Sequence, residues 1–241
     1  FIGIKEVMNY TVSDLRPYID WTFFFIAWEM KKLYPDILED SAYGKEAKKI
    51  FNDANKMLDF IEENNIVDIK GVFGIFKANS NGDNIELYNK DKSLAATFNL
   101  FREQRKKNKG PYLCLSDFIA PKEINKDDYL GGFIVTTGLK ADEYVKKLES
   151  EGDSYNAIML KLVYDRLAEA FAEKLHEDIR KNYWGYAKDE NLSMKEIFKA
   201  SYRGIRPAFG YPSLIDQSQM KILFNLLNGE KVTGVKLTES Y

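Results

Sequence analysis

The hydrophobic period of this chain changes partway along it, from a helical repeat to a strand repeat. Across residues 44–64 apolar side chains recur every three or four positions with charged residues between them, which predicts an amphipathic helix. Two alternating or apolar runs follow at 71–78 and 85–88, and the turn-rich cluster between them is typical of an antiparallel hairpin. Because both periods occur in one chain, the sequence predicts an α+β fold with an antiparallel sheet.

The rest of the chain continues this mixture of helical and extended segments. Helical spacing recurs at 97–109, from 141 onward, at 154–183 and at 218–227, and Ser193 with Glu196 predicts a capping box before a short helix. Further strands are predicted at 112–115, 131–137 and 235–238. No repeat, low-complexity tract or linker interrupts the pattern, so we expect one domain over residues 1–241.

Composition excludes several classes of protein. An apolar fraction of 45% supports a substantial core, and 35 basic against 37 acidic residues give no global signal for nucleic acid or for an anionic membrane. The densest apolar run, 21–28, is too short to span a bilayer. With Cys114 as the single cysteine and His176 as the single histidine, no internal disulfide and no Cys/His zinc site is expected, which suits a cytoplasmic setting.

Residues 202–212 contain two prolines and two glycines, a composition that indicates a loop with a defined backbone conformation. Each proline biases the residue before it, Arg206 or Tyr211, toward extended backbone. An arginine fork binds a carboxylate through two parallel hydrogen bonds, and a tyrosine offers a flat apolar face. The segment therefore predicts a clamp for a ligand with a carboxylate and a ring; a surface crossover whose arginine pairs with a nearby acid is the open alternative.

Three further polar features leave alternatives open. Asp20 begins an aromatic run, where a partly desolvated carboxylate either meets a cation or caps a helix. Glu169 and His176 lie two turns apart on the helix predicted at 154–183, which is compatible with a polar site, although a lone helical histidine is more often a surface or core residue. The basic residues of 102–109 suit either a helix C-terminus or a docking patch for an acidic partner.

Several long motifs follow one another in a recognisable order. They are Tyr-Ile-Asp-Trp-Thr at 18–22, Asp-Ala-Asn-Lys-Met-Leu at 53–58, Tyr-Leu-Cys-Leu-Ser-Asp-Phe-Ile-Ala-Pro at 112–121, Tyr-Asn-Ala-Ile-Met at 155–159, Asp-Arg-Leu-Ala-Glu-Ala-Phe-Ala-Glu at 165–173, Tyr-Trp-Gly-Tyr-Ala at 183–187, and Arg-Pro-Ala-Phe-Gly-Tyr-Pro at 206–212. Through these motifs the chain resembles the S-adenosylmethionine-binding activation (reactivation) domain of cobalamin-dependent methionine synthase.

The resemblance implies a single C-shaped α+β domain with a twisted antiparallel sheet, forming the C-terminal part of a larger methyltransferase of methionine biosynthesis. That enzyme moves a methyl group from methyltetrahydrofolate to homocysteine through cobalamin, which another domain binds. The activation domain supplies S-adenosylmethionine, and a flavodoxin-type partner supplies an electron, so that inactive cob(II)alamin returns to methylcobalamin. The expected partners are thus the cobalamin-binding domain and the electron donor, and the isolated domain is not expected to be catalytic.

The resemblance also implies a set of ligand-binding residues, with neither a catalytic residue nor a metal ligand among them. They are Asp20, Glu169, Arg206, Pro207, Ala208, Gly210 and Tyr211. Arg206 is expected to bind the α-carboxylate of the ligand, Asp20 its α-ammonium, and Glu169 to lie near the sulfonium.

The chain departs from the family pattern in three places. Phe23 and Phe209 stand where the family usually has proline, and the sequence ends at Tyr241, where the family continues into a segment that also lines the ligand site. We therefore expect the C-terminal segment of the family domain to be missing. A docking module that no longer binds S-adenosylmethionine is the main alternative.

Two other classes fit less well. A self-sufficient methyltransferase would need a glycine-rich turn after a parallel strand, whereas residues 71–74 lie in a predicted hairpin. A hydrolase using Asp20 and Glu169 as a carboxylate pair would leave the clamp without a role.

Overall fold

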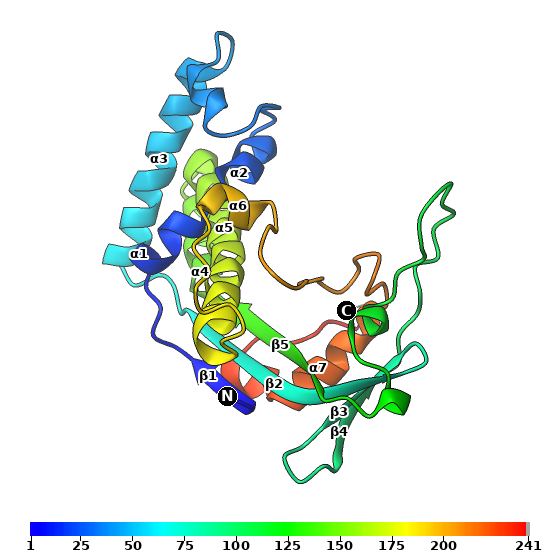
Figure 1. Ribbon diagram of the computed structural model, residues 1–241. Helices are drawn as coiled ribbons and strands as arrows, with labels where there is room; N and C mark the ends of the chain where they lie inside the picture. The colour runs from blue at the N-terminus through cyan, green and yellow to red at the C-terminus, as the bar shows by residue number, and fades with distance from the viewer. Residues whose placement is uncertain (240–241) are drawn as a thin grey trace. The chain divides into compact units, whose positions relative to one another are not determined.

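The computed structural model describes residues 1–239, which form two compact units. Unit 1 is built from Phe1–Val7, Gly71–Ile134 and the chain from Tyr202 onward. Unit 2 is built from Met8–Lys70 and Val135–Ser201. Unit 1 holds most of the sheet and unit 2 most of the helices, so the predicted α+β class is confirmed (Figure 1).

The sheet of unit 1 is centred on one long strand. Its five strands are β1 (Gly3–Val7), β2 (Lys70–Asn81), β3 (Asn84–Tyr88), β4 (Leu94–Phe98) and β5 (Asp128–Thr136). β1 and β3 pair antiparallel with successive halves of β2, β4 pairs antiparallel with β3, and β5 also pairs with β2. Asn81 faces Asn84 across a two-residue turn, where Gly82 has φ +59°. The hairpin predicted from the turn-rich cluster is thus confirmed.

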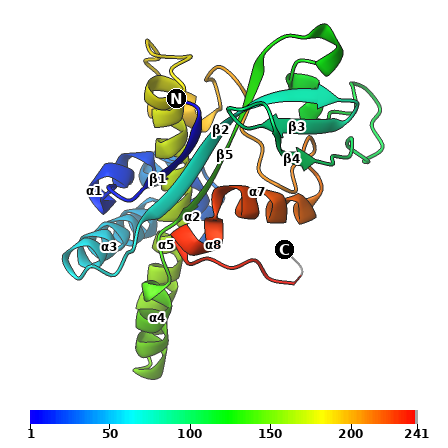
Figure 2. The same ribbon diagram turned by 90° about the horizontal axis from the view of Figure 1, so that it is seen from below.

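Two C-terminal helices, α7 (Met220–Leu227) and α8 (Gly229–Thr233), lie beside this sheet (Figure 2). The buried core under them joins Val72, Ile85 and Ile134 of the strands with Leu227 of α7. A Cβ atom on Gly132 of β5 would come within 2.6 Å of Leu223 Cδ1, so α7 packs closely against the strand here and a larger residue would require the Leu223 side chain to shift.

Unit 2 is a helical assembly around one long helix. Its helices are α1 (Val12–Leu15), α2 (Trp21–Ala27), α3 (Gly44–Glu63), α4 (Lys140–Ser150), α5 (Ser154–Asp178) and α6 (Met194–Phe198). α1, α2, α3 and α4 all contact α5, whose last turn continues into a π-helical turn at Ile179–Tyr183 (Figure 1). The helices predicted at 44–64 and 154–183 and the capping box of Ser193 and Glu196 are confirmed. Within the described residues, no helix is long and apolar enough to cross a membrane.

Three predicted elements are wrong. Residues 97–109 are not helical, because Thr97 and Phe98 pair with β3 and the chain beyond them forms an open loop. Residues 112–115 are not a strand, and a 3₁₀ helix, Leu115–Phe118, begins there instead. Residues 235–238 form no strand either, since α8 ends at Thr233, its C-cap Gly234 has a left-handed conformation, and the chain continues without regular structure.

Candidate functional site

The predicted clamp is a loop of unit 1 without helix or strand. Gly204 has φ +94° and Gly210 has φ +93°, which is left-handed backbone that glycine adopts without strain. A Cβ atom on Gly210 would also lie 3.0 Å from Gln217 Nε2. The prediction of a loop with a defined backbone conformation is therefore confirmed.

Backbone hydrogen bonds hold the second half of the clamp in one conformation. Gly210 N donates to Leu214 O at 2.8 Å, and Leu214 N donates to Tyr211 O at 2.8 Å. Tyr211 N donates to Ala208 O at 3.2 Å. The turn is fastened to the core of unit 1 because Leu214 is buried there and because Ser213 O accepts from Leu115 N at 2.8 Å.

The two side chains that the clamp was predicted to offer lie in different surroundings. Arg206 is half-buried, and its guanidinium carbon lies 6.0 Å from the centroid of the Phe133 ring on β5. Tyr211 is 61% exposed, so its ring is open to a ligand. Phe133 was missed by the sequence analysis, because an aromatic residue inside an apolar strand gives no signal of contact with a distant arginine.

In unit 2, Asp20 is the N-cap of α2. Its Oδ1 accepts from Thr22 N at 2.9 Å, and the side chain is half-buried. Of the two roles that the sequence left open, the helix-capping role is the one observed. Within residues 1–239 no hydrogen bond to Oδ2 of Asp20 is present, so one carboxylate oxygen remains available for a cation.

The aromatic run after Asp20 is amphipathic and only partly buried. Trp21, Phe24 and Phe25 are buried, while Phe23 and Ile26 are exposed. The reason is the helical period of α2, which turns positions 23 and 26 to the opposite face. Arg166 of α5 lies over the Phe23 ring, 6.0 Å from its centroid.

Glu169 lies on α5, one turn beyond Arg166, and is exposed. His176 is buried on the same helix, so the two residues do not share a polar site. Nδ1 of His176 is 2.7 Å from Nη1 of Arg180, which means that Nδ1 accepts and the imidazole is neutral at that nitrogen. The histidine is thus a hydrogen-bonded core residue, one of the alternatives that the sequence allowed.

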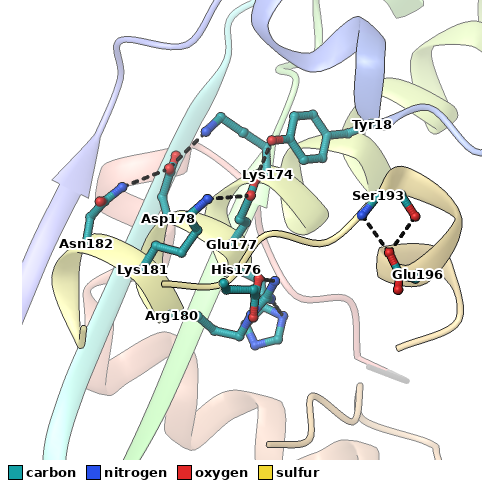
Figure 3. A network of polar contacts seen from close by, with 11 residues as sticks. Tyr18, Lys174, His176, Glu177, Asp178, Arg180, Lys181, Asn182, Ser193 and Glu196 are labelled. Carbon is teal, nitrogen blue, oxygen red and sulfur yellow. Dashed lines mark hydrogen bonds and ion pairs between the residues drawn. The ribbon is translucent and has the colours of Figure 1, made fainter. Parts of the chain in front are cut away.

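His176 belongs to a polar network around the π-helical turn (Figure 3). Arg180 is fully buried, and its Nε donates to Glu190 Oε2 at 2.9 Å. On the neighbouring side the Tyr18 hydroxyl donates to Glu177 Oε2, and Lys174 Nζ lies 2.9 Å from Asp178 Oδ1. Burial and the bond to Glu177 raise the pKa of Tyr18, so the phenol keeps its proton.

The network fixes the segment that follows the π-helical turn. Ala187 N donates to Arg180 O at 3.1 Å, and Trp184 N donates to Ile179 O at 2.8 Å. The buried ion pair of Arg180 with Glu190 closes the same segment through side chains. Backbone and side-chain contacts therefore both hold this segment against the π-helical turn.

The seven predicted site residues are divided between the units. Asp20 and Glu169 belong to unit 2, on helices that pack against each other. The other five belong to the clamp of unit 1: Arg206, Pro207, Ala208, Gly210 and Tyr211. In the described part of the chain, no group of three or more His, Cys, Asp or Glu side chains is arranged to hold a metal ion.

Comparison with known proteins identifies the family that this chain matches and a related solved structure. The family model described as "Vitamin B12 dependent methionine synthase, activation domain" matches residues 11–241. A solved structure described as "Crystal Structure of the MetH Reactivation Domain bound to AdoHcy" is 46% identical in sequence and superposes with a TM-score of 0.95. The match covers 100% of this chain and 74% of that one.

Proposed function

Because the chain belongs to the activation-domain family of vitamin B12-dependent methionine synthases, we propose that it binds S-adenosylmethionine and supports the reductive remethylation of inactive cob(II)alamin to methylcobalamin. The observation that carries the proposal is the relative bound to AdoHcy, which is S-adenosylmethionine without its transferable methyl group. The clamp of this chain supplies the arginine fork and the open ring that such a ligand needs.

In this proposal the clamp binds the amino-acid end of the ligand. Arg206 donates two parallel hydrogen bonds to the α-carboxylate. Pro207 has no N–H and offers its carbonyl, whereas the carbonyl of Ala208 is already taken by Tyr211 N, which leaves Ala208 its N–H. Gly210 provides the left-handed turn that places Tyr211, whose exposed ring receives the flat part of the ligand.

The two carboxylates of unit 2 complement the positive charges of the ligand. Asp20 uses Oδ1 to cap α2 and has Oδ2 for the α-ammonium. Glu169 is exposed on α5 and is proposed to lie near the sulfonium, where its negative charge favours the cation. These residues bind and orient; the corrin, when another domain presents it, supplies the chemistry of methyl transfer.

We further propose that the partners are the cobalamin-binding domain of methionine synthase and a flavodoxin-type electron donor in the cytoplasm, and that the isolated domain is not catalytic. The only histidine of the chain, His176, is buried inside unit 2, and its Nδ1 is engaged by Arg180. No axial ligand for a corrin is therefore expected from this side chain.

A calorimetric titration of S-adenosylmethionine into the chain and into Arg206→Ala tests the proposal. Loss of the guanidinium leaves the ligand carboxylate without this hydrogen-bonded counter-charge, which is expected to cost about 2–5 kcal/mol of binding free energy. Arg105→Ala, which removes an exposed arginine of unit 1, is the matched control and should bind as the parent does. Equal binding by Arg206→Ala would refute the role of the clamp. Absence of binding by the folded parent chain would refute the function and favour a docking module.

A further inference from the structure

The loop 99–114 leaves the end of β4 (Figure 1). Its sequence carries an unusual concentration of positive charge. It contains five basic residues and one acidic residue, in a chain with 35 basic and 37 acidic residues in all. Stabilisation of a helix dipole does not explain these cations, because the segment is not helical.

One cation of the loop is used internally at its base. Arg102 Nη1 donates to Asp117 Oδ2 at 2.8 Å and to Tyr112 O at 3.0 Å. Its Nη2 lies 2.6 Å from Asp117 Oδ1 and 2.8 Å from Asp83 Oδ1 in the hairpin turn. Arg102 also holds the pKa of the Asp117 carboxyl below its usual value. Both ends of the loop are thereby tied to the hairpin and to the 3₁₀ helix.

A second cation closes the loop on itself. Lys107 forms an ion pair with the buried Glu103 and donates to Pro111 O at 3.0 Å. Glu103 N donates to Leu113 O at 2.9 Å, which joins the two arms of the loop. The loop therefore has a defined shape set by its own contacts.

The remaining three cations, Arg105, Lys106 and Lys109, take no part in these contacts. All three are exposed, and within residues 1–239 none of them forms an ion pair or a side-chain hydrogen bond. The same loop and the 3₁₀ helix that follows also carry three exposed large rings. These rings are Phe101, Tyr112 and Phe118, which are 58%, 45% and 46% exposed.

We propose that the loop 99–114 is a docking surface for an acidic face of a partner protein. Arginine and aromatic residues are enriched at protein interfaces, and the exposed surface of this segment offers Arg105 together with three exposed rings. Fixed anchors at Arg102 and Lys107 lower the entropy lost on docking, since the loop is already closed. The outward charges steer an acidic partner toward this end of unit 1.

A nucleic acid fits this surface less well. Affinity for a phosphate backbone grows with the number of phosphates that lysine and arginine side chains neutralise. Only Arg105, Lys106 and Lys109 are available here, and the rest of the chain carries more acidic than basic residues. The surface therefore favours carboxylates presented together with apolar groups.

The test uses a fluorescent ten-residue peptide of glutamates and aspartates with one central phenylalanine as the probe. Its binding to the chain is followed by polarisation at low and at near-physiological salt. The variant Arg105→Gln/Lys106→Gln/Lys109→Gln is compared with Lys45→Gln/Lys146→Gln/Lys195→Gln, which removes three exposed lysines elsewhere and has the same net charge. Exposed charge pairs contribute modestly, so the loop variant should bind about tenfold more weakly, while the control keeps the parent affinity within about twofold.

The same samples also test where the peptide binds on the chain and whether the surface prefers an acidic peptide to a nucleic acid. Carbodiimide should join the peptide to Lys106 and Lys109 in preference to other lysines. Equal weakening of both variants, absence of salt-sensitive binding, cross-links spread over the whole surface, or tighter binding of an oligothymidylate of equal charge would each overturn the proposal. The loop variant should keep its affinity for S-adenosylmethionine, so failure here and failure of the proposed ligand site are distinguishable.

Discussion

The guanidinium carbon of Arg206 lies 6.0 Å from the centroid of the Phe133 ring. At this distance the electron-rich face of the ring attracts the cation and restrains its orientation. Arg206 is the residue proposed to bind the ligand carboxylate, and Phe133 comes from the strand β5. We therefore expect Phe133 to position the Arg206 side chain.

Replacement of Phe133 by leucine keeps an apolar side chain but removes the ring face. We expect roughly two- to fivefold weaker binding of S-adenosylmethionine, in line with about 0.5–1 kcal/mol for a cation–π contact. Phe133→Tyr retains the face and should bind like the parent in the same titration. If leucine and tyrosine variants bind equally well, the ring does not position Arg206.

Asp20 has two roles that substitutions separate. Asp20→Asn keeps an oxygen that accepts from Thr22 N, so α2 should stay capped while binding weakens, by less than in Arg206→Ala. Asp20→Ala loses both roles and should also lower the free energy of unfolding by about 1 kcal/mol. Calorimetry reports the first effect and thermal unfolding the second. Undiminished binding by Asp20→Asn would remove Asp20 from the ligand site.

Gly210 is constrained by its backbone conformation as well as by its neighbour. Gly210→Ala places a Cβ atom at φ +93° and 3.0 Å from Gln217 Nε2, so we expect a loss of about 1–2 kcal/mol in stability together with weaker ligand binding. Gly152→Ala is the matched control, since Gly152 has φ +79° with nothing within 4 Å and lies in unit 2. It should lose stability without losing affinity.

The buried ion pair of Arg180 with Glu190 makes unit 2 sensitive to loss of one partner. Glu190→Gln removes the carboxylate that pairs with a fully buried guanidinium and should lower the free energy of unfolding by about 3–5 kcal/mol. Replacing both residues, as Arg180→Met/Glu190→Leu, should recover most of that loss. Denaturant unfolding followed by circular dichroism measures both. A double variant as unstable as the single one would show that packing, and not charge, is decisive.

Unit 1 should lose stability in acid through Glu86. Hydrogen bonds from Lys122, Tyr88 and Asn81 lower the pKa of Glu86 from 4.5 to about 2. A depressed carboxyl pKa stabilises the folded state above the unfolded value, and this contribution disappears as pH falls from about 4.5 to about 2. Glu86→Gln should flatten this part of the stability profile, whereas Glu143→Gln, an exposed glutamate of α4, should leave it unchanged. Parallel profiles for Glu86→Gln and the parent would contradict the assignment.

Local sequence pattern predicted the elements whose stability is local. The helix α3 follows from its own apolar face, and the hairpin of β2 and β3 from its own turn, since both are specified by residues close together in the chain. The clamp was also predicted, because proline and glycine restrict or permit backbone conformations wherever they occur.

Tertiary structure decided what depends on residues far apart in the chain. Residues 97–109 have the apolar spacing of a helix, yet Thr97 and Phe98 pair with β3 and complete the sheet. The contact between Arg206 and Phe133, the burial of His176 against Arg180 and the division of outward from anchored cations in the loop 99–114 likewise need the folded chain. The physical reason is that strand pairing, burial and desolvation depend on which residues are neighbours in space. A periodic sequence pattern does not encode those neighbours.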